Sequence, residues 1–214
     1  MLVCKPWNQW CLDNKLWRTL EISNRPLNPS ILKGIVRRQP SNLAITSANA
    51  TAKQIEWLLS RLPRLGGLDL SLNTASAVSA ILNVQYLPPL STLNLSWCDA
   101  IFDRFMAQVL GPMRNGAVEA NGLSRLHFIE NLNLTGCDVA YETMNYTFTM
   151  LPSLRCLDVS YCTKVKDRDF AIVKNKKNEN KATLKRIVVQ GCPLVTEALV
   201  AHFTSCSDLP ALVL

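Results

Sequence analysis

The side chains that could do chemistry in this chain of 214 residues are its 8 cysteines, 2 histidines and 16 acidic residues. Metal binding, thiol redox work and acid–base catalysis need such groups in pairs or clusters. The sequence has no C-x-x-C, H-x-D or H-x-E pair, and His127 and His202 stand in unrelated contexts. No phosphate-binding G-x-x-x-x-G-K and no G-x-S-x-G occurs either. We therefore predict that this chain is not an enzyme and holds no cofactor or metal ion.

Four of the cysteines recur at one position of a repeated pattern. Cys98, Cys137, Cys162 and Cys192 each close a stretch such as LSTLNLSWC at residues 90–98. This spacing, L-x-x-L-x-L-x-x-N/C, is typical of a leucine-rich repeat. A small side chain whose thiol can bond weakly to the backbone suits the turn that leaves each strand. Free thiols in that role indicate a reducing compartment, either cytosol or nucleus.

The repeat has a period of 25 residues, interrupted by two longer steps of 39 and 30 residues. The anchoring aliphatic side chains are Leu43, Leu68, Leu93, Leu132, Leu157, Ile187 and Leu212. Such repeats stack so that each contacts only its neighbours. The sequence therefore predicts an α/β leucine-rich-repeat solenoid, or horseshoe, with a parallel concave sheet and convex helices. About seven units occupy residues 19–214, and the last is incomplete.

Apolar stripes at helical spacing fall between the anchors and predict helices that face the core. The stripes are Ile55, Leu58, Leu59 and Leu62; Phe102, Phe105, Met106, Val109 and Leu110; and Val195, Ala198, Leu199 and Phe203. The two longer steps hold residues 113–125, with two Asn-Gly turns, and the polar run Lys174 to Lys181. The net charge is +7, of which residues 164–186 carry +6. A solvated loop is the favoured interpretation of the basic run; contact with phosphate or an acidic protein is the alternative.

Strand residues that alternate with the leucines should face outward from the concave sheet. One predicted row is Asp69, Asn94, Asn133, Asp158 and Val188, and a second is Ser71, Ser96, Thr135, Ser160 and Gln190. Two mostly polar rows on a curved surface suit an extended protein partner rather than a small molecule. We predict no direct nucleic-acid binding, and no apolar run is long enough to span a membrane.

Trp97 and Tyr161 lie just beyond their strands, at the rim of the predicted sheet. Exposed aromatic side chains there would anchor a partner. Packing against the neighbouring turn is an equally good interpretation. The predicted partner-binding residues are therefore Asp69, Asn94, Trp97, Asn133, Asp158 and Tyr161.

Residues 7–17, WNQWCLDNKLW, resemble the end of an F-box. Residues 34–40 (GIVRRQP) and 53–63 (KQIEWLLSRLP) resemble the JmjC-type histone H3 lysine demethylases, in the branch that carries CXXC and PHD domains with a C-terminal F-box and leucine-rich repeats. We therefore expect residues 1–18 to be the C-terminal remnant of an F-box and the chain to be a fragment. In the alternative interpretation, Trp7, Trp10 and Trp17 only cap the solenoid.

The resemblance implies a nuclear chromatin protein. In that family the F-box docks the small adaptor of cullin-RING ubiquitin ligases, which here would involve Trp7, Trp10 and Trp17, and the repeats hold substrate or chromatin partners. The family's iron(II)- and 2-oxoglutarate-dependent catalytic residues are not in this sequence. Two alternatives stay open: a targeting fragment of a histone demethylase whose catalytic domain is absent from this chain, and a repeat scaffold unrelated to ubiquitin.

Overall fold

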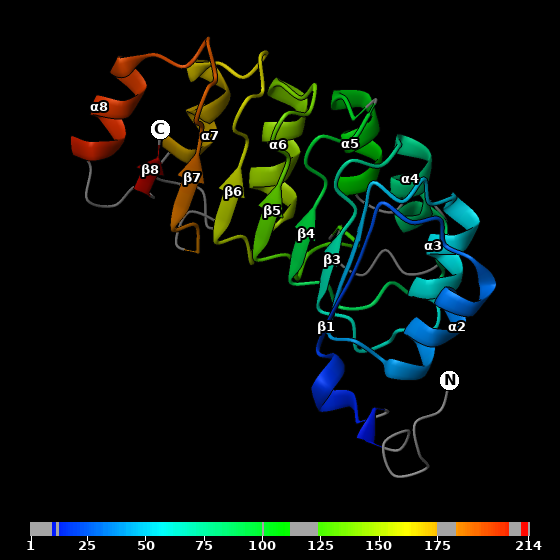
Figure 1. Cartoon of the computed structure of the whole chain (residues 1–214). Helices are drawn as coiled ribbons and strands as arrows, with labels where there is room; N and C mark the ends of the chain where they lie inside the picture. The colour runs from blue at the N-terminus through cyan, green and yellow to red at the C-terminus, as the bar shows by residue number, and fades with distance from the viewer. Residues whose placement is uncertain are drawn as a thin grey trace.

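The eight strands of the protein form one parallel sheet in chain order, as seen in a computed structural model (Figure 1). The structure describes residues 10–11, 13–99, 101–111, 124–174, 183–205 and 211–213. The helices lie on the outer side of the curved sheet. This arrangement confirms the predicted leucine-rich-repeat solenoid. The strands are β1 (Thr19–Ser23), β2 (Asn42–Thr46), β3 (Gly67–Asp69), β4 (Thr92–Asn94), β5 (Asn131–Asn133), β6 (Cys156–Asp158), β7 (Arg186–Val188) and β8 (Ala211–Val213).

The predicted anchors pair in register along the whole sheet. Leu43 pairs with Leu68, and the series continues without a slip to Ile187 and Leu212. From Leu43 to Ile187 the anchors are at most 2% exposed, because they lie between the sheet and the helices. The strand β1 extends the series by one, with Leu20 opposite Leu43. Neither longer step disturbs the register.

The helices cover the apolar face of the sheet. Among the described residues, no helix is long and apolar enough to cross a membrane. They are α2 (Pro29–Arg38), α3 (Ala52–Leu59), α4 (Ala75–Asn83), α5 (Asp103–Leu110), α6 (Tyr141–Met150), α7 (Ala171–Lys174) and α8 (Glu197–Ser205), with 3-10 helices η1 (Asn14–Trp17) and η2 (Asp167–Phe170).

Most residues of the predicted stripes are buried, whereas Phe105 and Val195 are partly buried and two residues are exposed. Ile55, Leu58, Leu59 and Leu62 are all buried. Phe102 is 43% exposed, because it has extended backbone at the N-cap of α5 rather than a place on the helix. Ala198 is also exposed, one residue into α8. The side chain of His202 and most of the two predicted loops lie outside the described residues.

The four repeat cysteines are buried, and each bonds to the preceding repeat. Their Sγ atoms donate to backbone carbonyls 3.1 to 3.3 Å away: Cys98 to Leu70, Cys137 to Leu95, Cys162 to Leu134 and Cys192 to Val159. The same position in an earlier repeat holds Asn73, whose Nδ2 donates to the carbonyl of Ile45 at 2.6 Å. The predicted structural role of these cysteines is confirmed.

Each of the strands β1 to β7 is followed by a residue in left-handed backbone conformation, four positions after the anchor. These residues are Asn24, Ser47, Leu72, Trp97, Gly136, Tyr161 and Gly191, with φ between +50° and +69°. Only glycine adopts this conformation without a steric cost. The turn reverses the chain from the sheet toward the next helix, so it recurs in every repeat.

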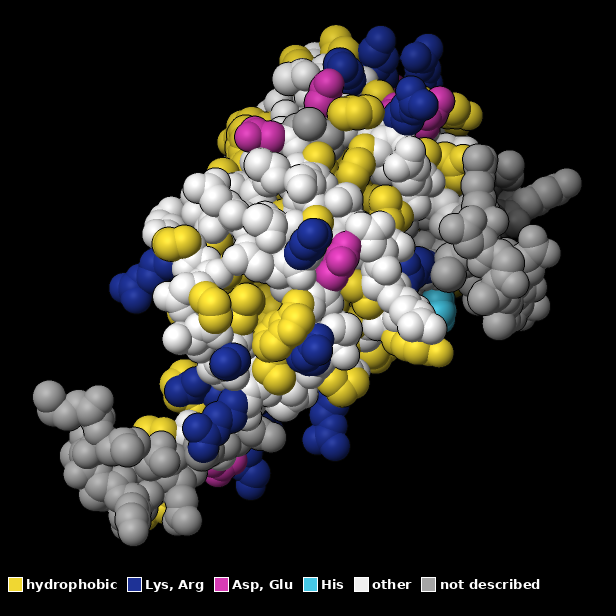
Figure 2. Space-filling view, turned by 90° about the vertical axis from the view of Figure 1, so that its right-hand side faces the viewer, with side chains coloured by type: hydrophobic (Ala, Val, Ile, Leu, Met, Phe, Trp, Pro, Cys, Tyr) yellow, Lys and Arg dark blue, Asp and Glu magenta, His cyan; other side chains and the backbone are white. Residues whose placement is uncertain are grey.

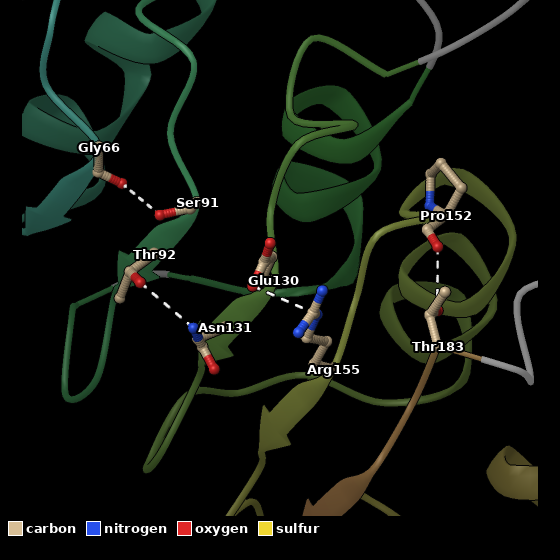
Figure 3. A network of polar contacts seen from close by, with 8 residues as sticks. All are labelled: Gly66, Ser91, Thr92, Glu130, Asn131, Pro152, Arg155 and Thr183. Carbon is tan, nitrogen blue, oxygen red and sulfur yellow. Dashed lines mark hydrogen bonds and ion pairs between the residues drawn. The ribbon is translucent and has the colours of Figure 1, made fainter.

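Polar side chains also join neighbouring repeats near the amino ends of the strands (Figure 3). The links are Ser91 Oγ to the Gly66 carbonyl, Asn131 Nδ2 to Thr92 Oγ1, Arg155 Nε to Glu130 Oε2, and Thr183 Oγ1 to the Pro152 carbonyl. Each link spans one repeat, so the solenoid is held at this edge by a chain of local contacts.

Replacement of Gly136 by alanine should lower the free energy of unfolding by about 2–4 kcal/mol, from strain at positive φ and from overpacking. The φ of Gly136 is +69°, and an added Cβ would lie 2.3 Å from Cε3 of Trp97. Urea unfolding followed by circular dichroism measures the loss. Gly66→Ala is the matched control, because its Cβ would meet nothing closer than 3.7 Å. An equal loss in both variants would contradict the explanation.

The four repeat cysteines should resist alkylation in the native protein. Burial raises the pKa of the Cys98 thiol to about 11 and that of Cys137 to about 12, and it raises the pKa of Cys162 and Cys192 as well. Since the thiolate is the nucleophile, N-ethylmaleimide at pH 8 should label the exposed Cys11 and leave these four unmodified until urea is added. Peptide mass spectrometry reads out each site, and native labelling of the four would refute the burial.

The same thiols make the stability of the fold depend on alkaline pH. Between pH 9 and about 11 the unfolded chain releases protons that folded Cys98 retains. Below pH 9 this thiol should therefore leave the free energy of unfolding unchanged. Above pH 9 the free energy of unfolding should fall. Urea titrations at pH 8, 9 and 10 test the sign; a rise in stability over this window would contradict it.

Candidate functional site

Four of the predicted site residues form one row on the inner face of the sheet. We call Asp69, Asn94, Asn133 and Asp158 the concave ladder; they are paired residues of β3 to β6, and all are partly exposed. Asn94 Nδ2 donates to Asp69 Oδ2 at 2.8 Å, which joins the first two. The structure therefore brings these four predicted residues together.

Each member of the concave ladder also holds the turn that follows its strand. The Oδ1 atom accepts a hydrogen bond from the backbone N–H two residues later, at 2.8 to 3.0 Å. Asp and Asn favour such turns because their short side chains reach their own backbone. One oxygen of each ladder residue is thus already bonded within the chain.

The second predicted outward row is wrong in three of its five members. Ser71, Ser96 and Ser160 are only 4–8% exposed. The strands end at the ladder residues, and the chain turns at once, so the alternation of faces does not continue to the serines. Thr135 is half-buried and Gln190 is exposed.

The inner face is hollowed over six strands, from Thr19 on β1 to Asp158 on β6. Neighbouring parallel strands lie about 4.8 Å apart, so the hollow is about 24 Å long. Among the described residues that line it, Asp69 and Asp158 carry the only charges. A hollow of this length and acidic character fits an extended segment that offers hydrogen-bond donors or positive charge.

Trp97 and Tyr161 contact each other at the rim, although they come from repeats that are not adjacent. Their ring centroids are 5.8 Å apart with the planes tilted by 35°. The repeat between them has Gly136 at the same position, and the Trp97 ring lies where a Cβ of residue 136 would be. The glycine therefore lets the two rings meet.

Trp97 and Tyr161 pack against neighbouring turns, as one interpretation of the sequence predicts. They are also half-exposed, as the role of partner anchors requires. Tyr161 lies against Gly191 as Trp97 lies against Gly136. Even so, Trp97 is 50% exposed and Tyr161 48%, and Leu72 at the equivalent position is 54% exposed. Leu72, Trp97 and Tyr161 make an apolar rim beside the concave ladder. The sequence prediction missed Leu72, whose fixed distance from the anchor is the signal that could have found it.

The predicted adaptor-binding tryptophans do not share one environment. Trp17 is half-buried; its Nε1 donates to the Cys11 carbonyl at 2.5 Å, and the Arg38 guanidinium lies 4.2 Å from its ring centroid. Trp10 is 64% exposed. Trp7 lies outside the described residues. Trp17 thus packs on the first repeat through Arg38 of α2, while Trp10 faces solvent.

The titratable groups of the described residues are dispersed. No group of three or more His, Cys, Asp or Glu side chains within this part of the chain could hold a metal ion. Two strands separate Asp69 from Asp158 in the sheet. His127 lies against Phe128, and its Nδ1 is 2.9 Å from the Ser124 carbonyl oxygen.

Comparison with solved structures supports the same fold. The chain superimposes on a chain of the yeast Rad7–Elc1 complex with a TM-score of 0.54 and 17% sequence identity, covering 87% of this chain and 53% of the other. At this identity the likeness concerns the fold alone. No family model matches the sequence.

Two curated proteins match nearly the whole chain. Lysine-specific demethylase 2B of Mus musculus is 31% identical over 211 residues, and lysine-specific demethylase 2A of Xenopus tropicalis is 32% identical over 210. Each match covers 98% of this chain but only 16% and 18% of the relatives, so the chain spans about one sixth of their length. The resemblance predicted from the motifs is confirmed: this chain is similar throughout to the F-box and leucine-rich-repeat region of the lysine-specific demethylases 2A and 2B.

Proposed function

We propose that this chain is a non-catalytic protein-recognition module that binds an extended protein segment along its concave face. The observation that carries the proposal is the pair Trp97 and Tyr161, half-exposed in left-handed backbone beside the concave ladder. No cofactor is needed for this role, because recognition uses only the side chains already on the surface.

The backbone conformation at the rim supports a binding role for the two aromatic residues. A bulky side chain in left-handed conformation costs about 1–2 kcal/mol relative to glycine. Gly136 and Gly191 at equivalent positions indicate that the turn itself does not require an aromatic ring. Tryptophan and tyrosine dominate the binding energy of many protein interfaces. A role as anchors for a partner would explain these side chains at strained, exposed positions.

The chemistry of the concave face describes the partner. An apolar side chain would contact the rim, and donors or positive charges would lie opposite Asp69 and Asp158. Strand spacing sets the reach at about 24 Å, which is the length of about seven extended residues. Such a partner is a protein segment rather than a metabolite.

We further propose a nuclear setting, in which the chain recruits substrate or chromatin partners for a cullin-RING ubiquitin ligase. The similarity to lysine-specific demethylases 2A and 2B supports the nuclear location. The F-box resemblance of residues 7–17 and the exposed Trp10 support adaptor binding. The same similarity favours a second candidate role, in which the recognised partner positions a demethylase on chromatin.

The ligase role is tested by complex formation with the small adaptor of cullin-RING ligases. Co-expression with the small cullin-RING adaptor and size-exclusion chromatography should yield a stable complex. Replacing Trp10 and Trp17 by alanine should weaken that complex while the repeats stay folded. Absence of any complex would remove the ligase role and leave concave-face recognition to be judged by its own test.

Alanine at both Trp97 and Tyr161 should weaken capture of nuclear partners by at least about 30-fold, because each ring is an expected hot spot worth about 1–2 kcal/mol. Immobilised protein is incubated with nuclear extract, and bound proteins are quantified by mass spectrometry. Tyr86→Ala is the matched control, since Tyr86 is 79% exposed and lies in the connection from α4 to β4 rather than in a turn that follows a strand. Partners retained equally by all three proteins would place the binding site elsewhere.

The charge of the concave ladder is tested with asparagine rather than lysine. Lysine would remove the Oδ1 atoms that hold the turns at Ser71 and Ser160, whereas asparagine keeps them, as Asn94 and Asn133 do. At position 69 asparagine also replaces the Oδ2 atom that accepts from Asn94 Nδ2, so D69N/D158N should stay folded with a loss of about 1 kcal/mol of stability. It should lose affinity for the captured partner, with a weaker dependence on salt. Unchanged affinity and salt dependence would exclude a role for these charges.

A further inference from the structure

The chain has a second basic region, residues 25–64, besides residues 164–186. Residues 25–64 contain seven basic side chains and a single acidic one, a local charge of +6. The basic residues are Arg25, Lys33, Arg37, Arg38, Lys53, Arg61 and Arg64, and the acidic residue is Glu56. Since residues 164–186 also carry +6 and the whole chain only +7, the rest of the chain is acidic.

Four of these basic residues are on α2 and α3, which cover the convex side of the first repeats. Figure 2 looks onto that side and shows hydrophobic side chains gathered among several Lys and Arg side chains, with few acidic ones. All of residues 25–64 belong to the described part of the chain. The concave face, lined by Asp69 and Asp158, carries the opposite charge.

A groove of about 360 Å³ lies between α2 and α3 within this basic region. Its lining residues are Pro29, Leu32, Lys33, Lys53, Gln54 and Trp57. The groove exists because α2 buries only Ile35 completely and packs less closely against α3 than α3 packs against α4. Leu32 of α2 and Trp57 of α3 pack against the core and are only partly buried. Their exposed surfaces line the floor of the groove.

The polar groups near the groove leave two lysines to meet a ligand. Gln54 bonds to the Leu27 carbonyl at 2.6 Å and to the Thr51 backbone. Glu56 accepts from Asn83 Nδ2 at 2.7 Å, so the one acidic group of the region is engaged with α4. Lys33 and Lys53 are exposed, one on each helix.

We propose that the groove between α2 and α3 is a second docking site, which binds an acidic protein segment through one apolar side chain. The apolar side chain would contact Leu32 and Trp57, and carboxylates on either side would face Lys33 and Lys53. Arg61, whose guanidinium lies 4.5 Å from the Trp57 ring centroid, adds positive charge at the same edge.

An acidic protein fits this groove better than a nucleic acid does. Phosphate contacts depend on exposed backbone N–H groups and basic side chains in a row along the backbone. Here the lining between the two lysines is mainly apolar, and Gln54 is engaged with the chain itself. An apolar floor with a basic border complements a segment that alternates apolar and acidic residues.

The site is tested first by selection from a displayed library of random 16-residue peptides against the immobilised chain. Enriched sequences should carry Asp or Glu around a Leu, Phe or Trp. Peptides that bind the concave face can be enriched as well, so the peptides that count are those whose binding is lost in K33E/K53E. No enriched peptide of this kind, or peptides of this kind without an acidic bias, would overturn the proposal, whereas failure of the concave recognition proposed above would leave it standing.

The selected peptide is then titrated by fluorescence anisotropy against defined variants. K33E/K53E should weaken binding by at least about 10-fold, because like charges then face each other. The control R104E/K185E makes the same change of net charge at two other exposed positions and should alter affinity by less than about 2-fold. Alanine at the peptide's apolar position should weaken binding to the native chain.

A 20-base-pair DNA duplex serves as the competing class of ligand. The proposal expects the duplex to bind the native chain and K33E/K53E alike, or neither. If the duplex binds, is lost on K33E/K53E and displaces the peptide, the groove is a nucleic-acid site and the proposal is overturned. Equal peptide binding by K33E/K53E and R104E/K185E would overturn it as well.

Discussion

The structure depends on one constraint: the anchor side chains must stack in register between the sheet and the helices. The anchors from Leu20 to Leu212 achieve this across the seven parallel pairings of the sheet. A slip by one residue would expose each anchor and bury a polar neighbour. Since the register is kept, every residue at a given position of the repeat lies beside its equivalents. The concave ladder and the apolar rim are consequences of that alignment.

The turn after each strand decides how much of the inner face is available to a partner. The side chain of the ladder residue accepts a hydrogen bond from the backbone N–H two residues later, and the residue after that one has left-handed backbone. The next residue is a buried Asn or Cys that donates to the preceding repeat. Polar atoms that look free in the sequence are therefore partly used within the chain. Asp69, for example, contacts both Ser71 and Asn94. What is left for recognition is the outer edge of the ladder and the apolar rim.

The two faces of the solenoid differ in charge, and this separates their partners. The concave hollow is lined by Asp69 and Asp158, whereas Lys33 and Lys53 border the convex groove. Opposite potentials favour encounter with oppositely charged segments and disfavour exchange between the sites. Repeat proteins allow such division, because each repeat contacts only its neighbours and carries its own surface. Two segments bound at the two proposed sites would therefore not compete for the same surface.

The sequence by itself determined the repeat, the sheet order, the buried anchors and the structural cysteines, because these follow from periodic side-chain positions. The four residues of the concave ladder were predictable for the same reason. Only the tertiary structure decided that Ser71, Ser96 and Ser160 are buried, that Phe102 leaves its helix, and that Trp97 reaches Tyr161 over Gly136. These properties depend on neighbours from other repeats and on where each strand ends. Periodicity specifies which side a residue faces within a regular element, whereas exposure at a turn depends on what the next repeat places beside it.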